Sequence, residues 1–246
     1  MKHQLTAELS AGRPTGTSTA ASTEESAGRS TGAPAGASAG LATELREGTR
    51  AEHRAAESAG FVTALLDGRL GPDAYADLAA QQLGVYRALE AGGGRLTGAA
   101  AALVAPELAR TAALEADLAH LWGPDWQGRV EPVPAVGRYV SRLDAVAATD
   151  VGYAAHAYVR YLGDLSGGQV VAAMLRRHYG VAEEGLRFYR FDGIEKVKPY
   201  KDAYRERLDA LPFDATERAA VVAEARYALR LNREVFDDLA DRHVRS

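Results

Sequence analysis

Cysteine is absent from this chain of 246 residues. Its absence excludes disulfide bonds, zinc–thiolate sites, iron–sulfur clusters and thiolate-ligated heme, so histidine has to supply any soft metal ligand. A chain without cysteine is also compatible with a reducing compartment, and we expect a cytoplasmic location.

Long apolar runs are missing as well. A membrane-spanning helix needs about 18 apolar residues or more, and no run in the sequence approaches that length, so we expect no membrane span. The net charge of -4 and the pI of about 5.9 give no basic footprint, and we expect no nucleic-acid partner.

Residues 11–40 lack aromatic side chains and contain no Val, Ile, Leu or Met. Of these 30 residues, 24 are Ala, Gly, Ser or Thr, so the segment has too little apolar surface to offset the chain entropy lost on folding. We expect residues 1–40 to form a disordered tail and residues 41–246 to form the folded domain. The tail has no apolar core of a secretory signal, and the pair Glu24-Glu25 argues against a transit peptide.

Alternation of apolar and polar residues, the sign of a strand, is scarce too. From Leu41 onward the apolar residues recur at helical spacings, which predicts an all-α fold in a single domain. Pro72-Asp73 and Thr149-Asp150 are typical helix starts. The predicted helices span residues 43–58, 61–66, 72–92, 106–121, 135–148, 150–178, 199–210 and 214–241.

What the chain does have is a glycine-rich stretch inside one of these helices. Residues 158–171 read YVRYLGDLSGGQVV, with Gly163, Gly167 and Gly168 inside six positions. Because glycine in a helix interior costs about 1 kcal/mol relative to alanine, the stretch gives up about 3 kcal/mol of helix preference. Gly163 and Gly167 are four residues apart and share a face, so a flat ligand can approach bare backbone there. A close helix crossing or a kink is the alternative explanation.

The same stretch resembles the distal-helix signature of the heme oxygenases. The resemblance rests on GDLSGGQ preceded by Tyr-x-Arg-Tyr-Leu, and it covers roughly residues 41–241. It implies a single-domain helical fold in which heme lies between a proximal helix and a kinked distal helix. It also implies an enzyme that cleaves heme oxidatively to biliverdin, carbon monoxide and free iron, using dioxygen and an external electron donor. Heme b is then both substrate and cofactor.

The sequence offers six histidines as possible ligands of a heme iron. His156 lies two turns before Gly163 on the glycine-rich helix, and we expect it to be structural. His53 lies in the middle of a predicted helix, where a satisfied or exposed histidine is the alternative. The remaining four are poor candidates because they lie at the chain ends or near predicted helix ends, namely His3, His120, His178 and His243.

The segment around His53 resembles the proximal helix of the family over Arg46, Thr49, His53 and Glu57. By this resemblance, His53 coordinates the iron through one ring nitrogen, while Glu57 orients the other nitrogen. A neutral histidine leaves one coordination position of the iron open for dioxygen.

The resemblance also assigns residues around the ring. Four side chains match the positions that contact the heme propionates, namely Arg46, Tyr158, Lys201 and Arg205. Solvated surface charge is the alternative for any charged one of them alone. Small and apolar residues are expected to line the ring, namely Gly168, Phe61, Leu65, Leu229 and Phe236.

On the distal side, the resemblance gives the central roles to Gly163, Asp164 and Gly167. By close backbone contact, the glycines direct oxygen along the ring towards a meso carbon. Asp164 is expected to hold a water that delivers a proton, and a weak ion pair with Arg160 one turn earlier is the alternative. The supporting water network is expected to include Tyr86, Arg160 and Asn232.

A noncatalytic heme carrier or sensor is the competing function, because it would keep the same pocket. Related helical scaffolds that degrade thiamin or hold two irons are excluded, since they need a cysteine nucleophile or two Glu-x-x-His motifs. We expect a monomer that receives electrons from a ferredoxin or a flavoprotein reductase. The candidate docking patch consists of basic residues that are otherwise an ordinary solvated face, namely Arg176, Arg177, Lys196 and Lys198.

Overall fold

The computed structural model describes residues 39–245. The tail that we expect to be disordered, residues 1–40, therefore lies almost entirely outside the described residues. The first described helix, α2, spans Leu41–Gly48 and is preceded by Gly40 as its N-cap. No described helix is both long and apolar enough to cross a bilayer.

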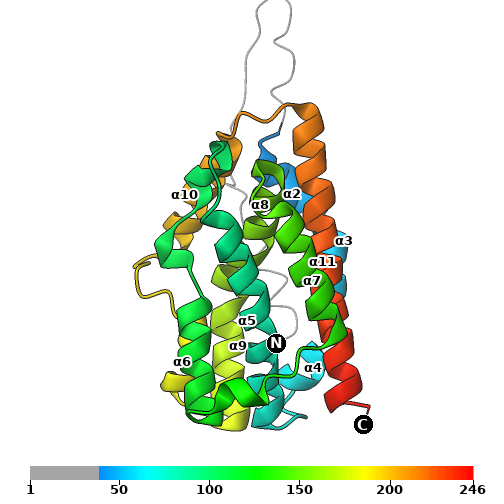
Figure 1. The fold of residues 1–246 in the computed structure, drawn as a ribbon, viewed down its shortest axis with the longest axis vertical. Helices are drawn as coiled ribbons and strands as arrows, with labels where there is room; N and C mark the ends of the chain where they lie inside the picture. Colours follow the sequence, from blue (N-terminus) through cyan, green and yellow to red (C-terminus); the bar gives the residue numbers. More distant parts are fainter. Residues whose placement is uncertain (1–38, 246) are drawn as a thin grey trace, which may run out of the picture.

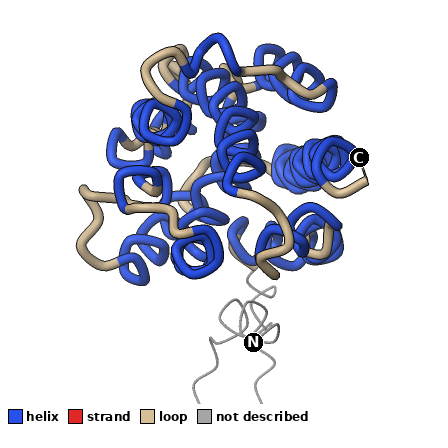
Figure 2. The backbone as a smooth tube through the Cα atoms, turned by 90° about the horizontal axis from the view of Figure 1, so that it is seen from below, coloured by secondary structure: helices blue, strands red, loops and turns tan. Residues whose placement is uncertain are grey.

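The described residues form helices and no strand, so the predicted all-α fold is confirmed (Figure 2). The α-helices after α2 are α3 (Arg50–Glu57), α4 (Gly60–Leu66), α5 (Pro72–Gly93), α6 (Thr111–Trp122), α7 (Pro134–Val146), α8 (Asp150–Ala157), α9 (Gly163–Tyr179), α10 (Val197–Asp209) and α11 (Ala215–His243). One π-helical turn, η4, spans Tyr158–Leu162. The 3-10 turns are η1 (Ala99–Leu103), η2 (Pro106–Leu108), η3 (Trp126–Arg129), η5 (Glu183–Gly185) and η6 (Arg187–Tyr189).

Two long helices build the frame (Figure 1). The 29-residue α11 packs along α3, α4, α7 and α8, while α5 packs against α6 and α7. α11 starts with a capping box. The Asp214 carboxylate accepts from the Glu217 N–H (2.8 Å), and the Glu217 carboxylate accepts from the Asp214 N–H (2.9 Å). α2 approaches α11 closely at Gly48, where an added Cβ would lie 2.5 Å from a methyl group of Val222. α2 therefore packs directly against α11.

Two predicted helices have different bounds. The predicted helix 43–58 is broken at Thr49, whose hydroxyl donates to the Leu45 carbonyl (2.7 Å), so it becomes α2 and α3. The predicted helix 106–121 begins only at Thr111. The reason is Glu90, whose carboxylate accepts from the N–H groups of Arg110 (2.6 Å) and Thr111 (3.1 Å) and so fixes the helix start at that point.

The predicted helix 150–178 forms as α8, η4 and α9 in succession. Thr149 caps it as expected, since its hydroxyl accepts from the Gly152 N–H (3.2 Å). The π turn η4 comes directly before Gly163, and π turns inside α-helices are frequent at functional sites. The irregularity of the distal helix therefore lies next to the glycines.

Candidate active site

The proximal segment α2–α3–α4 runs alongside the distal segment α8–η4–α9 in the same direction and touches it at both ends. Near one end, Thr49 lies beside the Tyr158 hydroxyl and acts to lower its pKa, against the effect of burial. Near the other end, the Tyr179 hydroxyl donates to the Leu65 carbonyl (2.7 Å). The two segments are therefore held side by side by contacts on either side of their centres.

In the sequence, His53 and Gly163 fall between the residues that make these two contacts. His53 comes four residues after Thr49, and Gly163 comes five residues after Tyr158. A Cβ added at Gly163 would meet no atom within 4 Å, so the space beside this glycine is open. A histidine on one segment and open, side-chain-free backbone on the other fit a flat ring with a metal at its centre.

His53 is partly exposed and lies beside a carboxylate. Its Nδ1 lies 3.5 Å from the Glu57 carboxylate, and the side chain is 36% exposed, so it is not sealed in the core. With Nδ1 directed to Glu57, Nε2 is the nitrogen that can coordinate a metal. The neighbouring Glu52 accepts from Arg226 of α11 (2.7 Å) and ties α3 to the long helix. The only buried residue of α3 is Ala56, so this tie is a large part of what positions the histidine.

The three glycines of the distal helix have different surroundings. Gly163 borders open space, and Gly167, one turn later, is half-buried. Gly168 is buried, and a Cβ there would lie 3.1 Å from the Tyr189 ring. Gln169 donates to the Tyr189 carbonyl (2.9 Å) and fixes this contact. The structure gives Gly168 a packing role, and its contact with the ring stays a prediction.

Asp164 accepts a hydrogen bond from the hydroxyl of Tyr86, a fully buried residue of α5. Burial raises the pKa of Asp164 well above its usual range. A carboxyl that holds its proton at higher pH can donate as well as accept, so this pair can store and move a proton beside Gly163.

Arg160 organises the rest of the distal network. It donates to Asn232 of α11 (2.7 Å) and to Gln82 of α5, and its guanidinium lies 4.8 Å from the centre of the Tyr86 ring. The predicted network of Tyr86, Arg160 and Asn232 is thus brought together. The alternative for Asp164, an ion pair with Arg160, is not among the ion pairs of residues 39–245. The sequence did not predict that Gln82 accepts a bond from Arg160, because a glutamine on a helix surface carries no distinctive sequence signal.

Two cations act on Tyr158 of η4. Burial raises the pKa of its hydroxyl, and Arg205 and Arg46 act in the opposite direction. On the same side, Lys201 donates to the Ser166 hydroxyl (3.2 Å), which joins α10 to the distal helix. Arg46, Tyr158 and Arg205 thus lie within electrostatic reach of one another, and Lys201 lies one turn before Arg205 on α10. Their binding of propionates stays a prediction.

The predicted ring-lining residues lie at different depths. Phe61 is fully buried, and its ring centre is 6.0 Å from that of His243 near the end of α11. Leu65 and Leu229 are also buried, whereas Phe236 is half-buried. Phe61 is thus a core residue of the α4–α11 contact, and its position beside the ring stays a prediction.

His156 has the structural position expected of it. It is fully buried, and its Nε2 lies 2.9 Å from the Glu224 carboxylate, which also accepts two hydrogen bonds from Arg142 (2.9 and 2.5 Å). Burial alone would raise the pKa of Glu224, but the hydrogen bonds from Arg142 and His156 outweigh it and lower the pKa to about 2. This ion-paired cluster fastens α7, α8 and α11 together.

The candidate docking residues lie at two separate elements. Arg176 and Arg177 lie in the last turn of α9, and Lys196 and Lys198 lie at the start of α10. All four are exposed. Arg176 pairs with Glu183 and Lys198 pairs with Asp202 (3.0 Å), so half of the positive charge is already neutralised.

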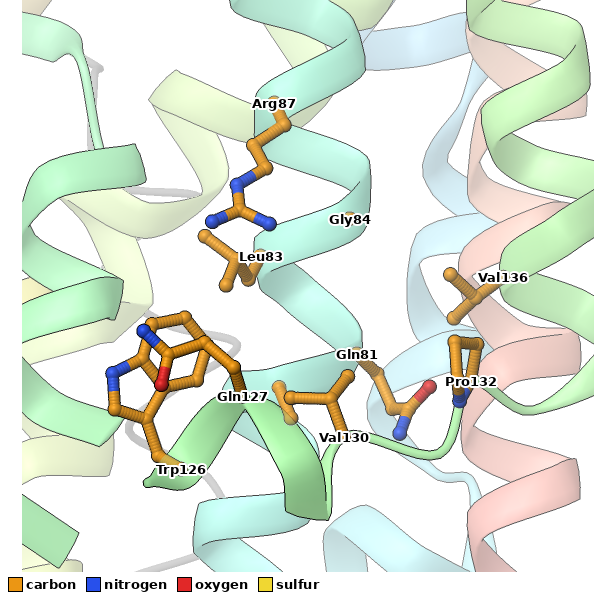
Figure 3. Close-up of a pocket in the computed structure, with 10 residues that line it drawn as sticks. Gln81, Leu83, Gly84, Arg87, Trp126, Gln127, Val130, Pro132 and Val136 are labelled. Atoms are coloured by element: carbon orange, nitrogen blue, oxygen red, sulfur yellow. The ribbon is translucent and has the colours of Figure 1, made fainter. Parts of the chain in front are cut away.

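A cavity of about 350 Å³ lies between α5, η3 and α7 (Figure 3). Its lining residues include Leu83, Trp126 and Val136, and none of the predicted site residues. Two of its polar side chains are already engaged: Gln81 bonds Asp77 (2.6 Å), and Arg87 bonds Glu115 (2.6 Å). This cavity is therefore separate from the candidate site.

A half-exposed histidine on one segment, and open backbone with a proton-holding carboxyl beside it on the other, are the components that a heme protein with chemistry at its ring needs. Comparison with known proteins identifies the family of this chain. The sequence profile named heme oxygenase matches residues 39–238, and the chain belongs to the heme oxygenase family.

Individual relatives agree with this assignment. Heme oxygenase 2 of Synechocystis is 38% identical over 203 residues, which cover 80% of this chain and 81% of that protein. Human heme oxygenase 1 is 37% identical over 204 residues, which cover 80% and 70%. The solved structure of Synechocystis heme oxygenase-1 in complex with heme superposes with a TM-score of 0.79 at 35% identity and covers 83% and 94%. The predicted family, fold and heme-cleaving activity are thereby confirmed.

Proposed function

We propose that His53 ligates the heme iron and that bare backbone at Gly163 and Gly167 covers the opposite face of the ring. Heme, when bound, supplies both the metal that activates dioxygen and the carbon that is oxidised. The chain supplies ligation, orientation and protons. The observation that carries the proposal is the open space beside Gly163, with a carboxyl–phenol pair directly next to it.

On the proximal side, Glu57 holds Nδ1 of His53, which leaves Nε2 for the iron. A neutral imidazole gives the iron less electron density than a thiolate, so breakage of the oxygen–oxygen bond is not forced from this side. The outcome of the reaction is then decided by the distal residues.

At the rim, cationic side chains fix how the ring is turned. Arg46, Lys201 and Arg205 offer positive charge from two elements, and Tyr158 adds a hydroxyl between them. Two propionates bound there would set which edge of the ring lies under the distal glycines.

On the distal side, Asp164 holds a proton in low-polarity surroundings, and the Tyr86 hydroxyl fixes the direction of its carboxyl. With heme bound, Asp164 would deliver its proton through a water, because the side chain is too short to reach the ring directly. The glycines at 163 and 167 would add no side-chain donor on this face of the ring.

A heme carrier or sensor would gain nothing from this distal arrangement. Desolvation of the Asp164 carboxyl, which bonds the buried Tyr86, costs free energy, and a protein that only binds heme has no use for a stored proton. The carboxyl–phenol pair therefore favours the enzyme.

The decisive experiment incubates purified protein with hemin, ascorbate and air, and follows the heme and bilin absorption bands. We expect the heme band to decay as a biliverdin band grows. An Asp164→Asn variant serves as the matched control, since it should bind hemin equally and form little bilin. Hemin binding without any bilin in the wild-type protein would leave the carrier function in place.

We further propose that a ferredoxin or a flavoprotein reductase supplies electrons to a monomer in the cytoplasm. Docking would use the exposed cations Arg177 and Lys196, together with their paired neighbours. Reversing the charges of Lys196 and Lys198 should lower reductase-driven turnover and leave ascorbate-driven turnover unchanged, because ascorbate needs no docking surface. Equal reductase-driven rates in variant and wild type would refute the proposal that these cations form the docking patch.

A further inference from the structure

Two buried charged side chains hold the short turn η6 from both sides. The carboxylate of Asp117, on α6, accepts from the N–H groups of Arg187 and Phe188 (both 2.8 Å). The guanidinium of Arg110, directly before α6, donates to the carbonyls of Phe188 (3.2 Å) and Arg190 (2.6 Å). Four backbone groups within residues 187–190 are thus fixed by two side chains.

This fastening costs the fold free energy. Asp117 is fully buried and Arg110 is 6% exposed, and taking a charged group out of water is unfavourable. Burial raises the pKa of Asp117 to about 6 and lowers the pKa of Arg110, so their hydrogen bonds do not fully offset the desolvation. A turn that only connected α9 to α10 could lie on the surface without such groups. The position of η6 therefore serves more than the connection.

η6 brings two buried aromatic rings to the distal site. The Phe188 ring meets the Tyr86 ring edge-on, with ring centres 5.5 Å apart, and Tyr86 is the residue that bonds Asp164. The next ring, Tyr189, lies 4.9 Å from that of Phe188 and packs against Gly168 of the distal helix. The turn therefore supports both the phenol beside Asp164 and the helix that carries Asp164.

We propose that Asp117 and Arg110 are positioning residues for the reaction. They hold Phe188 against Tyr86, and Tyr86 in turn fixes the direction of the Asp164 carboxyl. Because an edge-to-face ring contact is directional, a shift of η6 turns the phenol and its hydroxyl. The proposal rests on the role of Asp164 proposed above, and it extends the distal machinery from α5 and α9 to α6 and η6.

Asp117→Asn tests the first step with little change of shape. The asparagine amide keeps one acceptor oxygen and presents an NH2 group to the other N–H of the turn. We expect faster hydrogen exchange at the Phe188 amide of the heme-free protein. We also expect a lower pKa of Asp164, because burial raises this pKa and a loosened turn admits water. NMR of isotope-labelled protein measures both, and an unchanged pair of values would overturn the proposal.

The same variant should alter the reaction in a way that lost stability alone would not. Its hemin affinity should stay within about twofold of wild type, because the residues proposed to bind heme are untouched, whereas the bilin formed per heme consumed should fall severalfold. Turnover with ascorbate and air, followed by absorbance, gives this bilin yield. A wild-type bilin yield in Asp117→Asn would overturn the proposal.

Asp150→Asn is the matched control. The Asp150 carboxylate also accepts from two consecutive N–H groups of a 3-10 turn, those of Ala99 (2.9 Å) and Ala100 (3.1 Å) in η1. η1 contains no aromatic residue and so brings no ring to Tyr86. This variant should keep the wild-type bilin yield and the wild-type pKa of Asp164. An equal fall of both in Asp150→Asn would show general loosening and would overturn the proposal.

Phe188→Leu removes the ring and keeps the hydrogen bonds of the turn. Its bilin yield should fall as in Asp117→Asn, and the double variant should lose no more than Phe188→Leu alone, because both changes act through one ring. Additive losses would overturn the proposal. If Asp117→Asn does not fold, Phe188→Leu decides by itself, since an unchanged bilin yield in this variant would also overturn it.

Asp164→Asn separates this proposal from the one on which it rests. An unchanged bilin yield in Asp164→Asn would reject the role of Asp164 and the positioning role with it. A loss of bilin in Asp164→Asn, together with wild-type yields in Asp117→Asn and Phe188→Leu, would reject the positioning role alone.

Discussion

At the scale of single residues, Gly163 and Gly168 do opposite things within one helix. Gly163 borders open space, whereas a side chain at Gly168 would press on the Tyr189 ring. Gly163→Ala should therefore raise the stability of the heme-free protein by up to about 1 kcal/mol and weaken heme binding and cleavage. Gly168→Ala should show no such gain and should retain heme. Thermal unfolding without heme measures the stability of each variant, and a hemin titration measures its heme affinity. A heme affinity that is weakened only in Gly168→Ala would contradict the assignment of heme contact to Gly163 and of packing to Gly168.

The second prediction at this scale concerns Asp164. Asp164→Ala should retain heme, because the carboxyl does not ligate iron, and should lose biliverdin formation by about 100-fold or more, as expected for a removed general acid. The same variant should gain peroxidase activity towards a phenolic dye, since oxygen is no longer directed to the ring. Product absorbance under single turnover measures the loss. Undiminished biliverdin output would refute the role of Asp164.

At the scale of elements, the short α3 depends on a charged contact to hold its place. It buries only Ala56, and Glu52 links it to Arg226, a side chain that is half exposed. Glu52→Gln should weaken heme binding by less than about tenfold, and the loss should shrink at high salt as the wild-type pair is screened. Glu234→Gln removes a similar pair with Arg138 (2.8 Å) between α7 and α11 and serves as the control. Equal heme affinities in Glu52→Gln and wild type at low salt would show that α3 needs no such tie.

Element types and the residues of the glycine motif could be predicted from the sequence, because apolar periodicity and a specific motif are local signals. The break at Thr49 and the late start at Thr111 could not, since the first is a helix-internal hydroxyl bond and the second depends on Glu90 from another helix. The π turn before Gly163 was also not predictable. The hydrogen bond from Arg160 to Gln82 was not predictable either, because it forms only where α5 packs beside Arg160 in the folded protein.

At the scale of the whole molecule, two buried carboxylates make the free energy of unfolding depend on pH in opposite directions. Burial raises the pKa of Asp117 to about 6, although its carboxylate accepts from the N–H groups of Arg187 and Phe188 (both 2.8 Å). The contribution of Asp117 to the free energy of unfolding is therefore fully present below about pH 4 and is lost as the pH rises through 6. The pKa of Glu224 is lowered to about 2, so its contribution is full above about pH 5 and is lost as the pH falls towards 2.

The variants Asp117→Asn and Glu224→Gln separate these two effects. The free energy of unfolding of Asp117→Asn should lack the fall between pH 4 and pH 6, and that of Glu224→Gln should lack the fall below pH 4.5; each effect is at most about 3 kcal/mol. Urea unfolding of the heme-free protein across this pH range gives both slopes. Parallel curves for the wild type and both variants would contradict the assignment.

All of these roles depend on where the heme lies between the proximal and distal segments. The most direct measurement is a crystal structure of the protein loaded with heme. We predict Nε2 of His53 bonded to the iron, with the backbone of Gly163 and Gly167 against the opposite face of the ring. An iron ligated by any other residue, or a ring bound away from these two glycines, would contradict the account.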